Sequence, residues 1–171
     1  ERDSAKPSHS TPCLYRTKGG QEQLIFTSDA HGIYALSAKD GSVQWESGPK
    51  TFDKRCVLSP VLAAGKILGT CGSGGGGNYI VAVTPPASGK GKPKVEYTIR
   101  KAAPYVPTSV VHDGLVYHVD DKGIATCMDP GNGEALWMER LDANFFGSPV
   151  VIDGKVYVIS RTGEVIVFAA S

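Results

Sequence analysis

The sequence predicts an all-β fold built from repeated four-stranded antiparallel units, and three observations predict it. A strand–turn–strand pattern occurs three times, with turn glycines Gly65, Gly114 and Gly154 separated by 49 and 40 residues. A second pattern, a polar turn followed by a strand ending in tryptophan, places Trp45 and Trp137 92 residues apart. No stretch of about 12 residues has helical periodicity. A period of roughly 40–50 residues with one glycine- and aromatic-marked hairpin per repeat is typical of β-propeller blades.

The strand–turn–strand pattern supplies the first two strands of a blade. It covers residues 59–68, 108–117 and 148–157, where apolar, β-branched runs flank an Ala-Gly or Asp-Gly pair. Glycine provides the positive φ that a tight two-residue turn needs, so each copy predicts a β-hairpin.

The turn–tryptophan pattern supplies the third and fourth strands. Residues 36–45 align without gaps on residues 128–137, and we expect Gly41 and Gly133 to hold the strained turn position. Joined together, the two patterns predict blades at about 11–48, 57–100, 107–141 and 147–171, the last with three strands. The gaps between strands are too short for the crossover helices of an α/β fold.

Composition excludes two classes of protein. The chain has 171 residues, 20% of them charged, and a formal net charge of +1. This balance excludes a polybasic nucleic-acid binder and an acidic tail. No apolar run approaches the roughly 20 residues that span a bilayer, so we expect no membrane span. The chain starts at Glu1 without a methionine, and we expect a processed or excised piece of a larger propeller.

The turn–tryptophan blocks also carry a family resemblance. Residues 129–137, Asp-Pro-Gly-Asn-Gly-Glu-Ala-Leu-Trp, resemble the repeat of pyrroloquinoline-quinone-type (quinoprotein-like) β-propellers. Residues 36–45 match less closely, with Ser37 where the family usually has aspartate, and residues 55–60 and 145–149 are similar to further family phrases. The resemblance implies that Trp45 and Trp137 have a structural role, packing between adjacent blades.

The resemblance also carries expectations about assembly and location. Rings of this family commonly have seven or eight blades, so four blades imply an open half-ring or a part of such a ring. We expect either a head-to-tail homodimer that closes an eight-bladed ring or open flanks packed against a neighbour. The implied setting is an exported bacterial protein, periplasmic or extracellular.

A quinone cofactor is not expected, although the family includes quinoprotein dehydrogenases. Those enzymes use an aspartate base, a calcium ion held by glutamate and asparagine, and often a disulfide between adjacent cysteines. Here no two cysteines are adjacent, the four histidines are scattered, and no catalytic or metal-binding motif occurs. Many family members are scaffolds. We therefore predict a non-catalytic binding or scaffold module, and the alternative is a fragment of a quinoprotein-type dehydrogenase or related enzyme whose active site lies in other blades.

The cysteines leave one pairing open. Cys56 and Cys71 flank the hairpin whose turn is Ala64-Gly65, and ideal pairing places Cys71 opposite Leu58, with Cys56 one diagonal step away. A disulfide needs a small register change or a bulge, and the alternative is two separate buried thiols. The other two cysteines, Cys13 and Cys127, are expected in different blades and unpaired.

Function in propellers is expected on the loops at one end of the blades, because loops carry binding residues on a rigid scaffold. We expect this face to bind a partner protein or a small polar ligand, with Arg55 and Tyr105 as the first candidates. The other candidates are His31, Asp53, Asn78, Asp120, Asp121, Asn144, Phe145 and Arg161. The same loops contain Asp29, Lys54, His118 and Phe146, and the glycine-rich residues 72–78 form either a plain loop or an anion-binding nest.

Overall fold

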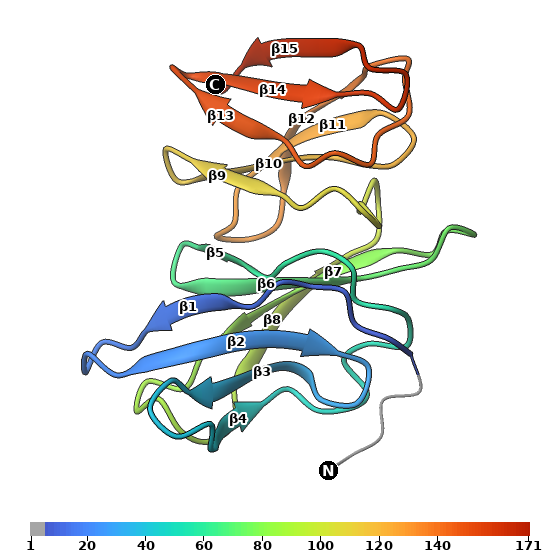
Figure 1. Cartoon of the computed structure of the whole chain (residues 1–171). Helices are drawn as coiled ribbons and strands as arrows, with labels where there is room; N and C mark the ends of the chain where they lie inside the picture. Colours follow the sequence, from blue (N-terminus) through green and yellow to red (C-terminus); the bar gives the residue numbers. More distant parts are fainter. Residues whose placement is uncertain (1–5) are drawn as a thin grey trace.

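The structure, a computed structural model, describes residues 6–171, and these form 15 strands in four antiparallel sheets without a helix (Figure 1). The predicted all-β fold of repeated antiparallel units is confirmed. Each sheet takes consecutive strands of the chain in spatial order, as the short connections require.

The first sheet contains β1 (Cys13–Arg16), β2 (Glu22–Ser28), β3 (Gly32–Ser37) and β4 (Val43–Glu46). The second contains β5 (Val61–Ala63), β6 (Lys66–Cys71), β7 (Tyr79–Thr84) and β8 (Lys94–Ile99). The third contains β9 (Val110–His112), β10 (Leu115–Val119), β11 (Ile124–Met128) and β12 (Ala135–Arg140). The fourth contains β13 (Val150–Ile152), β14 (Lys155–Ile159) and β15 (Val165–Ala169).

The hairpins between the first two strands of the last three sheets have the turn that their sequence predicts. Both central residues have positive φ in each, at 48° and 71° for Ala64 and Gly65 and at 46° and 79° for Asp113 and Gly114. Two consecutive positive φ values define a type I′ turn, whose twist matches that of the flanking strands. Gly41, with φ of 71°, holds the positive φ expected of it at the turn between β3 and β4.

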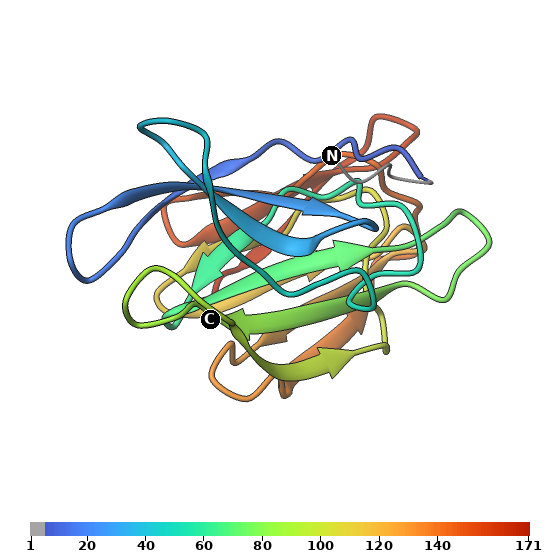
Figure 2. The ribbon, with the colours of Figure 1, turned by 90° about the horizontal axis from the view of Figure 1, so that it is seen from below.

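The sheets stack in chain order, from the first at the bottom of Figure 1 to the fourth at the top, and Figure 2 views the stack with the first sheet in front. The innermost strand β9 contacts both β5 and β13. Register shifts between the third and fourth strands recur in the first three sheets, at 35/36, 82/83 and 127/128. Such irregularities increase the local twist of a sheet.

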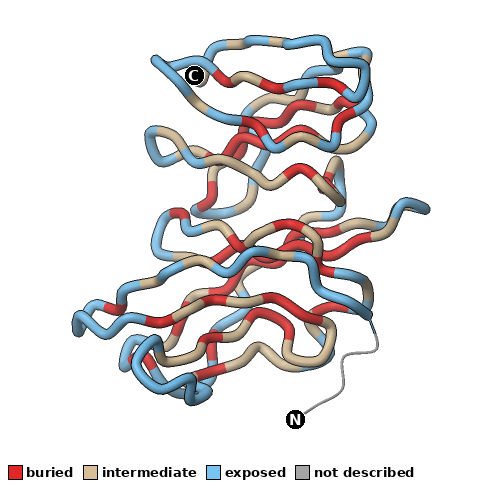
Figure 3. Tube along the Cα trace, viewed as in Figure 1, coloured by how far each residue is buried: buried red, intermediate tan, exposed pale blue. Residues whose placement is uncertain are grey.

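Buried residues are concentrated on the strands of neighbouring sheets that lie inside the stack, coloured red in Figure 3. One cluster joins the first and second sheets, a second joins the second and third, and a third joins the third and fourth. Alternation along β7 divides its residues: Val81 and Val83 enter the first cluster, whereas Ile80 and Ala82 enter the second. The inner strands are therefore apolar on both faces.

Both tryptophans lie in these clusters. Trp45 is 2% exposed between the first and second sheets, and its Nε1 donates to Gln23 Oε1 at 2.9 Å. Trp137 packs against the third cluster, where its ring meets the Phe168 ring edge-on at 5.7 Å.

The outer faces of the two end sheets are also apolar. One row of cross-strand partners on the first sheet consists of Leu14, Leu24, Leu36 and Val43. On the fourth sheet, the corresponding face carries Val150, Ile152, Tyr157, Ile159, Val165 and Val167. Leu14 is 51% exposed and Val165 59% exposed, and β15 lies mostly exposed at the top of Figure 3. Nothing in the described chain covers these two faces.

Candidate functional site

Two adjoining cavities lie at the ends of the sheets where the predicted binding loops meet. The first has a volume of about 390 Å³ and is bordered by the loops β6–β7, β8–β9, β10–β11, β12–β13 and β14–β15. The second has a volume of about 510 Å³. Ser73, Gly74 and Tyr105 line both cavities, so they form one continuous surface. Its charged and aromatic side chains are those of Lys6, Asp53, Lys54, Arg55, Arg100, Tyr105, Asp120, Asp121, Lys122, Phe146 and Arg161. We call this surface the loop face.

Tyr105 is fixed at the centre of the loop face by two neighbours. Its backbone N–H donates to Asp121 Oδ2 at 2.6 Å. A Cβ atom on Gly72 would lie 2.9 Å from the Tyr105 ring, so only glycine allows this close approach. The two residues expected first at the site, Arg55 and Tyr105, line the same 510 Å³ cavity.

The acidic side chains of the loop face are used by the protein itself. Asp120 Oδ1 accepts from the backbone N–H groups of Lys122 and Ile124 at 3.0 and 2.8 Å. Asp53 Oδ1 accepts from the Tyr79 hydroxyl at 2.9 Å. Asp121 holds the backbone of Tyr105, and its burial raises the pKa of this carboxyl, although backbone hydrogen bonds lower it. These carboxylates fix loops in place.

Four of the cationic side chains, in contrast, have no carboxylate partner. Among residues 6–171, none of Arg55, Arg100, Lys122 and Arg161 takes part in a salt bridge. The Arg161 guanidinium lies over the Phe146 ring at 4.5 Å from its centroid, which holds the charge at the surface beside an exposed aromatic. The loop face is therefore basic in its available charge, although its loops contain acidic as well as basic residues.

Asn78 closes the glycine-rich loop. Its Oδ1 accepts from Ser73 N at 3.0 Å, and its Nδ2 donates to Ala103 O at 3.3 Å. The side chain thus ties the β6–β7 loop to itself and to the segment that leads to Tyr105. Asn78 lines the cavity, but its side-chain amide is already hydrogen-bonded to the protein.

Phe145, which the sequence analysis places on the binding face, is buried instead. Its side chain is 0% exposed in the third cluster, because Phe145 pairs with Ser160 in a β-bridge that turns the ring inward. The next residue, Phe146, is 51% exposed and lines the cavity instead. His118 is likewise not a loop residue: it belongs to β10 and is 2% exposed.

Two other predicted residues lie outside both cavities. His31 Nδ1 is 2.8 Å from Glu46 Oε2, and the ring centroid lies 4.9 Å from that of Tyr34, with the two rings tilted by 43°. Asn144 is exposed, and its carbonyl accepts from Arg161 N at 2.8 Å. Sequence reasoning missed Arg100 and Lys122. Lys122 follows the predicted Asp120 and Asp121, and Arg100 directly follows β8 in the segment that leads to Tyr105.

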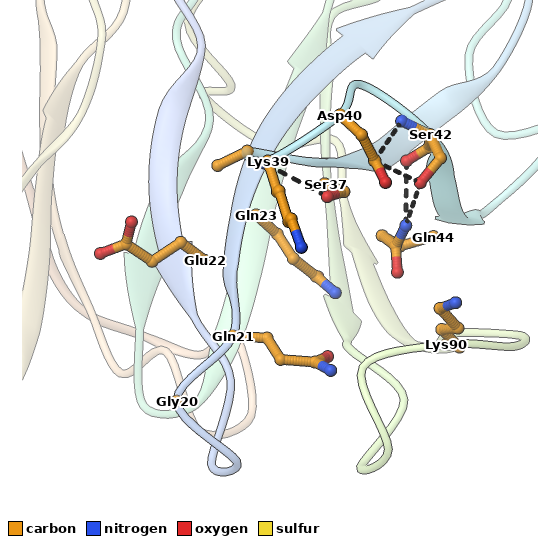
Figure 4. A pocket seen from close by; sticks show the side chains of 11 residues that line it. Gly20, Gln21, Glu22, Gln23, Ser37, Lys39, Asp40, Ser42, Gln44 and Lys90 are labelled. Carbon is orange, nitrogen blue, oxygen red and sulfur yellow. Dashed lines mark hydrogen bonds between the residues drawn. The ribbon is translucent and has the colours of Figure 1, made fainter.

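A third cavity, of about 530 Å³, lies at the opposite end of the first sheet (Figure 4). Its polar side chains bond one another: Asp40 Oδ1 accepts from Ser42 N and Oγ at 3.0 and 2.7 Å, and these bonds lower the pKa of Asp40. The Gln44 amide donates to Ser42 O at 3.0 Å. The groups of this cavity thus shape turns, and it is the weaker candidate.

Within residues 6–171, no group of three His, Cys, Asp or Glu is arranged to hold a metal ion, and the carboxylates of the loop face are committed to N–H and hydroxyl donors of the protein. The described residues also contain no helix of the length and apolarity needed to cross a bilayer.

Comparisons with known proteins give the fold and the family. The chain superposes on the crystal structure of BamB from Moraxella catarrhalis with a TM-score of 0.67 and 16% identity. That match covers 94% of this chain but 47% of BamB, so the chain spans about half the length of that protein. The computationally designed Ika4 protein matches with a TM-score of 0.67 and 11% identity over 95% of this chain and 92% of Ika4. No curated protein sequence matches significantly.

The structural matches and the four stacked sheets define a partial β-propeller. The family described as outer membrane protein assembly factor BamB, a propeller family built from pyrroloquinoline-quinone-type repeats, matches residues 33–171. The expected quinoprotein-like repeat is thereby confirmed, and the chain belongs to this family.

Proposed function

We propose that the chain is a non-catalytic binding module that uses its loop face to hold a carboxylate-bearing segment of a partner protein. One observation carries the proposal: four cationic side chains of the loop face lack a carboxylate partner, while the acidic side chains beside them are bonded to the protein. Carboxylates of a partner would form salt bridges with these cations. Arginine suits this task because its planar guanidinium binds carboxylates in a bidentate manner.

The aromatic side chains refine the partner's chemistry. Phe146 is half exposed beside Arg161, and Tyr105 lines both cavities. An extended peptide that alternates acidic and aromatic side chains would match guanidinium groups and rings together. Because the loop face extends over two adjoining cavities, it suits a peptide segment better than a compact small molecule.

The family description supports a protein partner and an extracytoplasmic location. The matching family is described as an outer membrane protein assembly factor, which agrees with an exported bacterial protein, periplasmic or extracellular. We therefore place the module in the group of propellers that assemble proteins, without a reaction of its own.

Fluorescence anisotropy with a rhodamine-labelled, eight-residue peptide of alternating glutamate and phenylalanine tests the binding. A peptide with lysine in place of glutamate is the ligand control. Arg161→Glu and Arg55→Glu should each weaken binding about tenfold, as expected for the loss and reversal of a charge-assisted hydrogen bond. Lys18→Glu, an exposed lysine on the first-sheet turn away from the loop face, should change it little. Equal binding of both peptides, or no effect of either arginine variant, would overturn the proposal.

We also propose that the apolar faces of the two end sheets join in a homodimer. The outer face of the first sheet in one copy would cover the outer face of the fourth sheet in the other. Two observations support a second copy as the occupant: both faces carry rows of exposed apolar side chains, and the chain spans 47% of BamB, so two copies have about the length of that propeller.

Size-exclusion chromatography with light scattering tests this assembly. We expect twice the chain mass of 18.0 kDa, and we expect Leu14→Lys and Val165→Lys to give monomers, because each places a charge in the interface. Lys18→Glu is again the control. A stable wild-type monomer at high concentration would refute the dimer, and so would larger assemblies.

A further inference from the structure

The two cysteines of the second sheet are cross-strand neighbours. Gly72 N donates to Arg55 O at 2.9 Å, and Arg55 and Gly72 form an antiparallel β-bridge. In an antiparallel pair, the residue after one partner faces the residue before the other. Cys56 therefore faces Cys71.

The fourth sheet contains an independent copy of this geometry. Its hairpin repeats the second-sheet hairpin with the same spacing, so Phe145 and Ser160 correspond to Cys56 and Cys71. There Arg161 N donates to Asn144 O at 2.8 Å, matching the Gly72–Arg55 bond, and Phe145 pairs directly with Ser160. The second and fourth sheets therefore share this register.

Both cysteines are free thiols in this structure, and their pairing predicts a separation that a disulfide can span. Cys56 and Cys71 follow a hydrogen-bonded pair, so they occupy the non-hydrogen-bonded site, where Cα atoms lie about 4.5 Å apart. Disulfides join residues with Cα atoms about 4.4–6.8 Å apart. Both side chains enter the same core cluster, at 1% and 0% exposure.

The remaining cysteines have other neighbours. Cys13 pairs with Ile25, and Cys127 pairs with Tyr117 and Trp137. Cys127 also lies in the third cluster, whereas Cys56 and Cys71 lie in the first. Cys56–Cys71 is thus the one cross-strand cysteine pair among residues 6–171.

We propose that Cys56 and Cys71 form a disulfide that braces the loop face. The two thiols give up two protons and two electrons to a disulfide oxidant, such as oxidised glutathione, which leaves as two thiols. The bond would fasten together the two segments that border the 510 Å³ cavity: Asp53, Lys54 and Arg55 directly precede one cysteine, and Gly72, Ser73 and Gly74 directly follow the other. This inference does not depend on the proposed ligand.

Burial determines when the bond forms. Burial first, and the neighbouring Cys71 thiolate second, raise the pKa of Cys56 to about 12. Because the thiolate is the reacting form, the folded, reduced protein should resist oxidation. The disulfide should therefore form during folding in the presence of the oxidant.

Refolding of the full chain in a glutathione redox buffer tests the proposal. After the refolded protein is denatured without reductant, a thiol titration should find two free thiols of the four cysteines. A tryptic digest should contain residues 56–66 linked to residues 67–90. The Cys13→Ser/Cys127→Ser double variant should keep this link and show no free thiol, whereas Cys56→Ala/Cys71→Ala should lose it. Four free thiols, or a link that involves Cys13 or Cys127, would overturn the proposal.

Reduction provides a second measurement. A bond that closes a loop of about 15 residues stabilises by chain entropy, and its loss should lower the melting temperature of the wild type by about 6–12 °C. The Cys56→Ala/Cys71→Ala variant should melt at the same temperature with and without reductant. Hydrogen exchange at Asp53, Arg55 and Ser73 should also speed up on reduction of the wild type alone. If the melting temperature of the wild type is the same with and without reductant, the disulfide does not stabilise the loop face as proposed.

Discussion

Two adjacent phenylalanines allow a stringent test of the structure at the loop face. Phe145 is 0% exposed between the third and fourth sheets, whereas Phe146 is 51% exposed beside Arg161. Phe→Ala at a buried position costs about 3–5 kcal/mol through lost burial and the cavity that remains. At about 2–4 °C per kcal/mol for a chain of this size, Phe145→Ala should lower the melting temperature by about 6–20 °C. Phe146→Ala should cost below about 1 kcal/mol, since surface changes have small effects.

Urea denaturation followed by tryptophan fluorescence measures both variants, because Trp137 packs against the cluster that contains Phe145. Calorimetry gives the melting temperatures. Phe146→Ala should weaken binding of the acidic–aromatic peptide while leaving the denaturation midpoint almost unchanged. If Phe146→Ala destabilises as much as Phe145→Ala, the assignment of the inward and outward rings is wrong.

Two further predictions concern the cores. Gly69→Ala places a Cβ atom 2.8 Å from Ile33 Cγ1 and 3.0 Å from Phe52 Cζ, so overpacking should lower the free energy of unfolding, measured by urea denaturation, by about 1–3 kcal/mol. Gly74→Ala, whose Cβ atom meets no atom within 4 Å, should leave this free energy unchanged. Equal effects of the two variants would contradict the packing of the first and second sheets. Burial lowers the pKa of His118 to about 4, from 6.5, so the unfolded chain binds a proton at higher pH than the folded chain does. Stability should therefore be full above pH 6.5 and fall by up to about 3 kcal/mol towards pH 4, and His118→Gln should remove this part of the pH dependence while His9→Gln does not.

The repeated hairpins are the part of the fold that the sequence predicts best. Asp-Gly and Ala-Gly pairs determine both the position and the type of the turn, because few other pairs accept two consecutive positive φ values. Once Gly65, Gly114 and Gly154 are fixed, strand alternation assigns the inward and outward residues of β6, β10 and β14. The stacking of sheets then follows from strands that are apolar on both faces.

Sequence reasoning fails where the ladder is interrupted. Pro60 has no N–H group to donate, and the regular pairing of β5 begins only at Val61. Pairing resumes on the other side of Pro60 with a shift of two residues, at Arg55 and Gly72. Extrapolation of the hairpin register across Pro60 therefore placed Cys71 opposite Leu58 instead of Cys56. The same interruption before the fourth sheet hid which of Phe145 and Phe146 turns inward.

The net available charge of the loop face could also not be predicted from the sequence. The predicted loops contain acids and bases in similar number, which indicates mixed charge. The structure shows that these acids are already hydrogen-bonded: Asp53 and Asp121 accept from Tyr79 and Tyr105 of other segments, and Asp120 accepts from the backbone of its own loop. Such partners depend on how loops of separate blades meet, and no local pattern encodes this.

Because the core is divided into three clusters, each sheet is stabilised only by its neighbours in the stack. Each sheet exchanges apolar contacts only with the sheets before and after it, so the free energy of folding is close to a sum of sheet and interface contributions. The end sheets have one such interface each and the middle sheets have two. Within one copy of the chain, unfolding should thus begin at an end and advance sheet by sheet. Evolution can lengthen or shorten such an array by whole blades, because adding one changes only the interface at the point of insertion.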